Sequence, residues 1–271
     1  MAFAAHPEFT PPSDENAIIW RYMDLSKFLS VLDKSALFFI RLDRLSEMDP
    51  FEGYYTNANL LTDRLRFEDL PEEWKTKGGI KDAETWEILR SSQQQMRQFV
   101  KINRAVTFVN SWYCQQHESA AMWSQYLRSG EGIAIQSSYR RLVESLQNYT
   151  EYNVQIGLVK YLNYERQAIP SGNLLSPFIY KRKSFEHERE IRALIWTPEH
   201  GKNDLSDPSK NKYRDELGIY VPIDLNILVE RVYLSPTSQP WYLELLSSLM
   251  KKYNLDGKEI ILSDLAKTPI Y

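Results

Sequence analysis

The sequence predicts an α+β fold with a mixed, largely antiparallel central sheet, flanking helices and one helical insertion. The chain has 271 residues, 43% of them hydrophobic and 25% charged, a composition typical of a folded globular protein. Short runs rich in β-branched and aromatic residues recur along the whole chain, and each is typical of a strand. Helical stretches do not separate these runs at regular intervals, so a purely parallel α/β sheet is not expected.

The beginning of the chain predicts an arm followed by a compact strand–helix–strand unit. Residues 1–16 contain three prolines, and we expect a flexible N-terminal arm before a single α+β domain at 17–271. A β-rich run at 17–23 predicts the first strand. Apolar residues then recur at helical spacing over 24–36, and another β-rich run follows at 36–42.

A long charged segment interrupts the pattern of strands. Residues 57–104 are rich in Glu, Lys, Arg and Gln, which predicts a helical insertion that serves as a lid or as a surface for a partner. A polar loop is expected at 204–214. Further strands are expected at 105–113, 132–138, 154–163, 188–196, 218–225, 230–236 and 258–265, with helices at 117–127, 138–149 and 241–255.

Charge and cysteine content exclude several classes of function. The net charge is -3 and the pI is near 5.9, so no overall positive field attracts the protein to nucleic acid or to a membrane. The single cysteine, Cys114, excludes an intramolecular disulfide and any zinc site built from several cysteines. The first residues do not resemble a secretory signal, and no apolar run approaches about 18 residues. A cytoplasmic location is therefore expected.

The stretch SFEHEREIRALIW at 184–196 contains the main candidate site. Glu186, Glu188 and Glu190 occupy every second position ahead of apolar residues, and SFEHE predicts a short helical turn before a strand that starts near Glu190. Arg192 then shares a strand face with Glu190 and can orient its carboxylate. Carboxylates at the start of a buried strand need partners, because unpaired buried charge is costly. They form either an acidic binding site or an ion-pair network with basic neighbours, namely Lys181, Arg182, Lys183, Arg189 and Arg192.

Two earlier segments carry further candidates. Arg21 lies in the first predicted strand, on the opposite face from Trp20 and Tyr22, and its planar guanidinium suits a phosphate or a carboxylate. In the turn DPFEG, Asp49 and Glu52 can together hold a cation or a ribose hydroxyl, or Asp49 can simply cap the turn.

The segment NSWYCQQHESAAMWSQY at 110–126 contains a cysteine and a histidine three residues apart. Cys114 and His117 at this spacing rarely form a catalytic pair, and no third orienting group is identifiable. Ser111 and Ser124 are the polar groups here that can contact a ligand. Met122, Trp123 and Tyr126 lie at helical spacing, which indicates a role in the core.

Four blocks, in this order, resemble the bacterial family known as domain of unknown function 2971. They are WRYMDLSKFLSVLDKSALFFIRLDRL, DPFEG, ESAAMWSQYLRSGEGIAIQSS and KRKSFEHEREIRALIW, and together they span most of the chain. This resemblance implies a fold family rather than an activity. Domains of this kind are often encoded near defence genes, so a bacterial defence or toxin effector is one expectation.

A more distant resemblance suggests a chemistry. The opening strand–helix–strand segment is similar to the beginning of ADP-ribosyltransferase-like folds. In the arginine–serine–glutamate branch of those enzymes, a first-strand arginine helps to bind NAD, a middle-strand serine shapes the nicotinamide pocket, and a late Glu-x-Glu motif carries catalysis. Arg21 matches the first, Ser111 the second, and the pair Glu188 and Glu190 the third. The Ser-Thr-Ser block of that branch is absent here.

The resemblance implies that NAD is a substrate, cleaved at the nicotinamide–ribose bond or used to transfer ADP-ribose to a protein or nucleic-acid acceptor. Glu190 would stabilise the positive charge that develops on the ribose, and Glu188 would position or activate the acceptor. Arg21 would hold the pyrophosphate or the ribose, and Tyr22, Trp112 or Trp20 would stack on nicotinamide. On this basis we expect Glu190→Gln to abolish activity with little change in melting temperature.

Two alternatives from other classes stay open. One is a module that binds a nucleotide or a partner protein without turnover. The other is a metal-dependent nuclease-like effector, which would use the basic runs at 140–141 and 181–183 for phosphates and its acidic residues for a divalent ion. The sequence does not indicate the oligomeric state or the acceptor.

Overall fold

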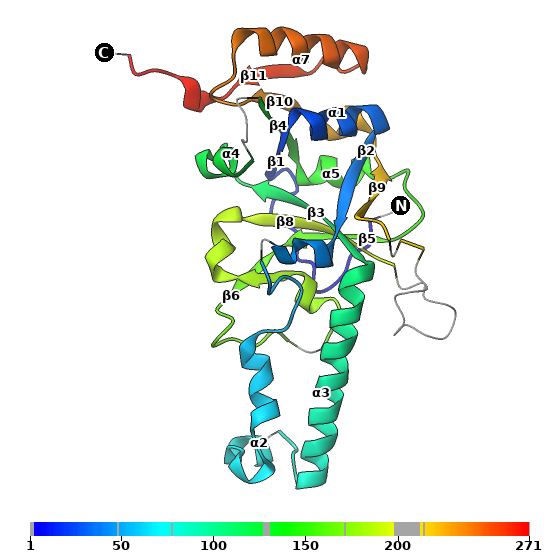
Figure 1. The fold of residues 1–271 in the computed structure, drawn as a ribbon, viewed down its shortest axis with the longest axis vertical. Helices are drawn as coiled ribbons and strands as arrows, with labels where there is room; N and C mark the ends of the chain where they lie inside the picture. Colours follow the sequence, from blue (N-terminus) through cyan, green and yellow to red (C-terminus); the bar gives the residue numbers. More distant parts are fainter. Residues whose placement is uncertain are drawn as a thin grey trace.

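A nine-stranded sheet forms the middle of the molecule in the computed structural model, which describes residues 3–270 except 48, 77, 127–130, 171, 198–211 and 214. Seven strands follow the order β11-β10-β4-β1-β3-β2-β9, and β8 and β5 continue the sheet from β3 (Figure 1). Most neighbours are antiparallel, whereas β10 and β11 are parallel. The predicted α+β class with a mixed, largely antiparallel sheet is confirmed.

The strands of this sheet are short, and most agree with the predicted β-rich runs. Their bounds are β1 (Ile18–Asp24), β2 (Ala36–Arg41), β3 (Thr107–Cys114), β4 (Gly132–Ser138), β5 (Val154–Leu158), β8 (Glu190–Trp196), β9 (Gly218–Pro222), β10 (Arg231–Leu234) and β11 (Glu259–Leu262). Two further strands, β6 (Lys160–Leu162) and β7 (Tyr180–Arg182), form a small parallel pair of their own.

Helices flank the sheet and form one long extension. The α-helices are α1 (Leu25–Lys34), α2 (Glu72–Thr76), α3 (Ala83–Asn103), α4 (Ala120–Tyr126), α5 (Tyr139–Ser145), α6 (Leu225–Leu228) and α7 (Pro240–Lys252). The 3₁₀ helices are η1 (Leu42–Glu47), η2 (Asn57–Arg64), η3 (Phe67–Asp69), η4 (Arg104–Val106), η5 (Ser176–Phe178), η6 (Lys183–Glu188) and η8 (Asp264–Ala266).

The strand–helix–strand unit at the start of the domain forms for local reasons. The Asp24 carboxylate accepts a hydrogen bond from the Lys27 backbone N–H at 2.8 Å and caps α1, which satisfies one of its free donors. Ser35 adopts a left-handed conformation, with φ of 44°, and ends the helix. Phe28 and Leu32, one turn apart, are both buried in the main core.

β3 is the strand at which the sheet divides. One of its edges pairs with β8 along nearly its whole length. The other edge pairs with β1 only at Tyr113 and Cys114, and with β2 only at Phe108 and Val109. Between these points β1 and β2 separate, and side chains span the gap. This division brings Arg21 of β1 next to the middle of β3.

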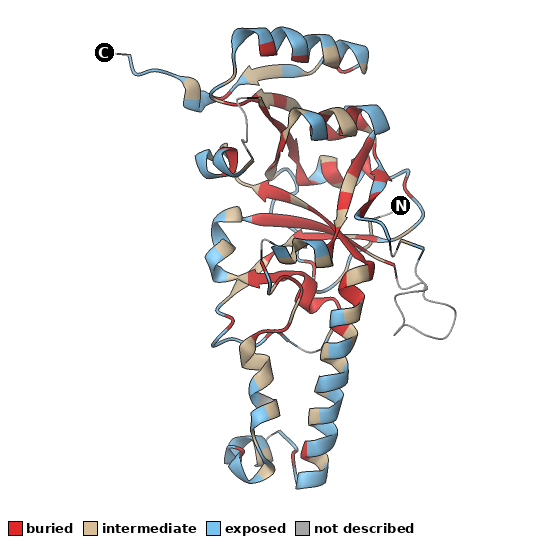
Figure 2. Cartoon of the chain, viewed as in Figure 1, coloured by how far each residue is buried: buried red, intermediate tan, exposed pale blue. Residues whose placement is uncertain are grey.

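The helical insertion stands out from the body as an elongated arm, which we call the helical arm and define as residues 57–103. Figure 1 shows α3 running away from the sheet alongside η2 and α2, and Figure 2 shows that most of this arm is exposed. At its tip, Leu70, Ile80 and Trp86 form a small apolar cluster separate from the main core. The insertion predicted over 57–104 is therefore mostly helical and has its own minimal core.

The described part of the N-terminal segment makes defined contacts. Phe9 is 4% exposed and packs in a core cluster, and the Leu158 N–H donates to the Thr10 carbonyl at 2.8 Å. A Cβ atom at Gly157 would lie 2.7 Å from the Phe9 backbone, so only glycine allows this close approach. In the structure, this stretch of the predicted flexible arm is thus packed against β5 rather than loose.

Other differences from the sequence prediction are local. The strand expected at 154–163 is two strands, β5 and β6, interrupted at Val159, which belong to different sheets. The helix expected at 138–149 ends at Ser145. The loop expected at 204–214 lies outside the described residues except for 212 and 213. Among the helices that the structure describes, none combines the length and apolar character needed to cross a membrane.

Candidate functional site

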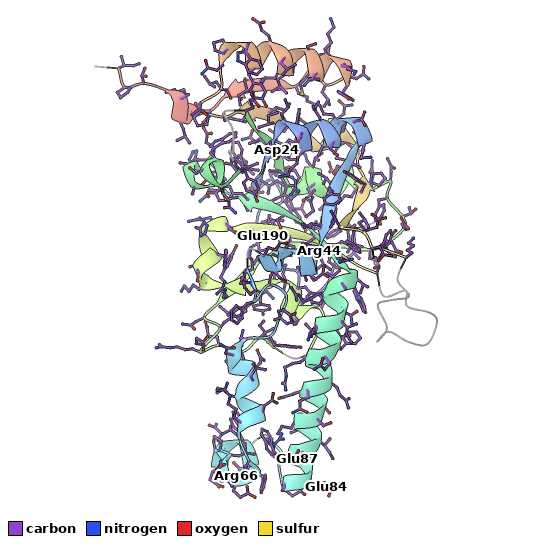
Figure 3. The ribbon with its side chains drawn as sticks, in the orientation of Figure 1. Asp24, Arg44, Arg66, Glu84, Glu87 and Glu190 are labelled. Atoms are coloured by element: carbon purple, nitrogen blue, oxygen red, sulfur yellow. The ribbon has the colours of Figure 1, made fainter. Side chains whose placement is uncertain are left out.

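The candidate site lies at the beginning of β8, beside the division of the sheet. Figure 3 shows Glu190 inside the body of the molecule, far from Arg66, Glu84 and Glu87 at the tip of the helical arm. The preceding η6 ends at Glu188, and Arg189 adopts a left-handed conformation, with φ of 38°, between the helical turn and the strand. The predicted switch from a helical turn at SFEHE to a strand at Glu190 is confirmed.

Glu190 is a buried carboxylate whose two oxygen atoms both accept several hydrogen bonds. It is 4% exposed. Its Oε1 accepts from Ser111 Oγ at 2.5 Å and from Arg192 Nε at 2.7 Å. Its Oε2 accepts from Lys181 Nζ at 3.2 Å and from Arg192 Nη2 at 3.1 Å. These four contacts use about all the acceptor capacity of a carboxylate.

A second buried carboxylate completes the pairing of Arg192. Arg192 is fully buried, and its Nη1 donates to Glu52 Oε1 at 2.7 Å and to the Phe178 carbonyl at 2.7 Å. Lys181 Nζ lies 3.6 Å from Glu52 Oε2 and also pairs with Glu188. The ion-pair network predicted as one alternative is thus present for Lys181 and Arg192.

Arg21 meets this network from a distant part of the chain. It follows the last residue of β1 that pairs with β3, and its Nη1 donates to the Ser111 carbonyl at 2.5 Å. The Ser111 hydroxyl in turn donates to Glu190. The structure therefore brings together Arg21, Ser111 and Glu190, which the sequence analysis selected from three separate segments.

The pKa values of these groups follow from their mutual pairing. Burial alone would raise the pKa of Glu190, but the charges of Arg192 and Lys181, with hydrogen bonds from Arg192 and Ser111, lower it to about 2. Burial acts against the charged form of Lys181, yet the carboxylates of Glu190 and Glu52 raise its pKa above the usual range. Burial lowers the pKa of Arg21, against the influence of Tyr126 and of Glu190. Glu190 is therefore an anion throughout the physiological range.

Partly exposed side chains surround the buried network. The side chain of Glu188 is 12% exposed and remains the more accessible of the two predicted catalytic glutamates. Tyr126 of α4 lies close enough to Arg21, Glu188 and Glu190 for their charges to influence its pKa, which burial raises. The Tyr161 hydroxyl accepts a hydrogen bond from the Glu190 backbone N–H at 2.9 Å. The sequence analysis assigned Tyr126 to the core and did not select Tyr161.

Two of the residues predicted to bind NAD lie in packed surroundings. Tyr22 is 4% exposed; its hydroxyl accepts from the Ser119 N–H at 2.9 Å and its ring packs edge-on against Trp123. Trp112 is 1% exposed, and its Nε1 donates to Asn110 Oδ1 at 2.8 Å. Arg21 lies 5.9 Å from the Trp112 ring centre. Neither ring is exposed for stacking on a ligand.

The structure also places the candidates Asp49, Glu52 and Cys114. Asp49 is buried and pairs with Arg182 at 2.6 Å, while Glu52 pairs with Arg192, so the two carboxylates of DPFEG have different cationic partners. Cys114 is partly exposed, and burial raises the pKa of its thiol, which disfavours the reactive thiolate.

Both arginines of the basic run at 140–141, proposed for a nuclease-like function, have acidic partners within the protein. Arg140 pairs with Glu15 at 3.0 Å, and Arg141 lies 3.6 Å from Glu230. Within the described ranges, no group of three or more His, Cys, Asp or Glu side chains is placed to hold a metal ion. The metal-dependent alternative stays a prediction without a supporting cluster in this part of the chain.

The chain was also compared with known proteins. No protein-family model matches it, and no curated protein matches it. The site consists of an anionic carboxylate, Glu190, that accepts hydrogen bonds from two cations and a serine, with the carboxylate of Glu52 and the guanidinium of Arg21 nearby.

Proposed function

We propose that the chain is an NAD-dependent ADP-ribosyltransferase-like enzyme that cleaves NAD or transfers its ADP-ribose, and that the Arg21–Ser111–Glu190 cluster is its site. One observation carries the proposal. Arg21 and Ser111 are 90 residues apart and Ser111 and Glu190 are 79 apart, yet Ser111 contacts both: its backbone carbonyl accepts from Arg21, and its hydroxyl donates to Glu190. The resemblance to the arginine–serine–glutamate branch pairs these three positions.

The chemistry of NAD cleavage requires a stable negative charge beside the ribose. When the bond between ribose C1′ and the nicotinamide nitrogen breaks, the electron pair leaves with neutral nicotinamide and positive charge develops on the ribose. The oxygen of water, or of an acceptor, then bonds to C1′ and its proton passes to a base or to solvent. A carboxylate fixed in the anionic form stabilises this charge without reorganisation. The lowered pKa of Glu190 satisfies that requirement.

Arg21 and Glu188 would contact the substrate in this proposal. Arg21 is partly buried and one of its guanidinium nitrogens is bonded to the Ser111 carbonyl, and the guanidinium suits the pyrophosphate of NAD because planar donors match phosphate oxygens. Glu188 retains some exposure and can orient or deprotonate the acceptor. Glu190, which is buried, would stabilise the developing positive charge on the ribose through its negative charge.

The same geometry favours one other function, a nucleotide-binding module without turnover. Both oxygens of Glu190 are occupied by Arg192, Lys181 and Ser111, so much of its negative charge is already compensated within the protein. A compensated carboxylate stabilises a developing positive charge less strongly than a free one. Binding through Arg21 does not depend on that charge.

Nicotinamide release from NAD distinguishes these functions. Wild-type protein incubated with NAD is expected to release nicotinamide, measured by chromatography, and Glu188→Gln is expected to reduce the rate by about 100-fold, a typical contribution of general acid–base catalysis. Glu186→Gln is the matched control, because Glu186 is exposed on the same turn, and its rate should equal that of wild type.

Two results would contradict the proposed enzymatic function. Binding of NAD without nicotinamide release indicates the binding module. The absence of both binding and release, with the protein folded, overturns the assignment of this cluster to NAD.

A further inference from the structure

A pocket lies where the helical arm joins the body. It has a volume of about 250 Å³ and lies between the turn after Asp49 and helices η2 and α3. Three aromatic residues, Phe51, Tyr54 and Tyr55, line it together with the apolar Leu60 and Val100 and the cationic Arg97. A mostly apolar pocket with few polar groups is typical of small-molecule sites.

One polar atom of this pocket lacks a partner. Tyr55 is 8% exposed, and its buried hydroxyl makes no hydrogen bond with any described residue. Burial raises the pKa of this hydroxyl, against the nearby charge of Arg97. Buried hydroxyl groups are normally paired, because leaving one unpaired costs free energy. A ligand atom that accepts this hydrogen bond would remove the cost.

Two of the aromatic rings that line the pocket are in contact with a cation. The Arg104 guanidinium lies 3.9 Å from the ring centre of Tyr54, and the Arg182 guanidinium lies 4.8 Å from that of Phe51. These contacts orient both rings before any ligand arrives, which reduces the ordering cost of binding. Arg97 is oriented by Asp63, which accepts from its Nη2 at 2.5 Å. Among the described residues, the other guanidinium nitrogens of Arg97 have no partner.

We propose that this pocket binds a small planar aromatic molecule with a hydrogen-bond acceptor or a negative group at one edge. The flat face would pack against Phe51 and Tyr54, and the polar edge would accept from the Tyr55 hydroxyl and from Arg97. The volume is below the range of drug-sized sites, which indicates one ring or two fused rings.

This site is separate from the Glu190 network. Phe51 and Glu52 are consecutive residues, but Phe51 lines the pocket whereas Glu52 pairs with Arg192. The proposal for this pocket therefore does not depend on whether the Glu190 network binds or cleaves NAD.

Calorimetric titration with adenine and with benzoate tests the proposal, with cyclohexanecarboxylate as a non-planar control. At least one planar probe is expected to bind at millimolar concentration or below, and the control is expected not to bind. Tyr55→Phe should weaken that binding by about 5-fold, the typical effect of one hydrogen bond. Arg97→Lys keeps the charge but loses the planar fork, so it should weaken benzoate more than adenine.

A comparison of Tyr55 with Tyr164 distinguishes an effect on ligand binding from an effect on stability. The Tyr164 hydroxyl is also buried but donates to the Tyr180 carbonyl at 3.1 Å. Without a probe, Tyr164→Phe is expected to lower the melting temperature, whereas Tyr55→Phe should leave it unchanged or raise it. The proposal is overturned if neither planar probe binds, if Tyr55→Phe binds both like wild type, or if it lowers the melting temperature as Tyr164→Phe does.

Discussion

The body and the helical arm differ in the environment of their charged residues: the body buries several of them, whereas the arm exposes most of them to solvent. In the body, β8 buries six of its seven residues, including Glu190 and Arg192, and each of these two charges has several partners. In the arm, only Trp86, Val100 and Asn103 of the 21 residues of α3 are buried. Water solvates the charges of the arm, but protein groups must replace water in the body. The same type of substitution should therefore have very different consequences in the two regions.

The largest effect is expected at Arg192. Arg192→Met removes the partner of Glu190 and Glu52 and leaves two buried carboxylates with less compensation. The free energy of unfolding should fall by about 3–5 kcal/mol, measured by urea denaturation. Arg66→Met on the arm is the control, because the Arg66 side chain is 77% exposed and water screens its pair with Asp69, so its loss should change the free energy of unfolding very little. Equal losses in the two variants would contradict the contrast between body and arm.

The next effect depends on pH. The folded-state pKa of Glu190 is lowered to about 2 from an ordinary value of 4.5, so its pairing stabilises the folded protein fully above the unfolded pKa. This contribution, about 3 kcal/mol, is lost as pH falls from about 4.5 to 2. Glu190→Gln should be less stable at pH 7 and should lose less stability over that pH range. Parallel stability curves for wild type and variant would show that the network is not formed.

The buried pairing of Glu190 also changes the sequence-based expectation for Glu190→Gln. The sequence suggested that this variant would keep its melting temperature, but a buried carboxylate with two cationic partners cannot be neutralised at little cost. Loss of activity in this variant would therefore reflect both chemistry and stability. Glu188→Gln is the more informative test of function.

A smaller effect on global stability is expected at the tip of the arm. Trp86 is 3% exposed and its Nε1 donates to the Leu65 carbonyl at 3.1 Å. Trp86→Ala should open the small cluster with Leu70 and Ile80 and speed amide hydrogen exchange there, while protection in β8 stays unchanged. Loss of protection in β8 would show that arm and body unfold as one unit.

Local patterns predicted most of the fold, because they reflect local physics. Helical spacing of apolar residues indicated α1, and the apolar residues on both faces after Glu190 indicated β8, a strand buried on both faces. The break at Val159 and the docking of the N-terminal segment depend on contacts between distant parts of the chain, for which no local pattern exists.

The site was predictable only in part for the same reason. The spacing of Glu190 and Arg192 on one strand face predicted their contact, which is confirmed. The meeting of Arg21 with Ser111 rested on resemblance, because no pattern within either segment indicates it. Tyr161 was missed because its role depends on the break between β5 and β6, which aligns its hydroxyl with the Glu190 backbone.

The affinity of the protein for NAD tests the central claim most directly, because both the enzyme and the binding module require Arg21 to hold the dinucleotide. Calorimetry should show NAD binding to wild type and at least about 10-fold weaker binding to Arg21→Lys, since the planar fork is lost while the charge is kept. The exposed Lys27→Arg substitution is the control and should bind like wild type. Equal affinity of Arg21→Lys and wild type, or no binding by either, would contradict the account.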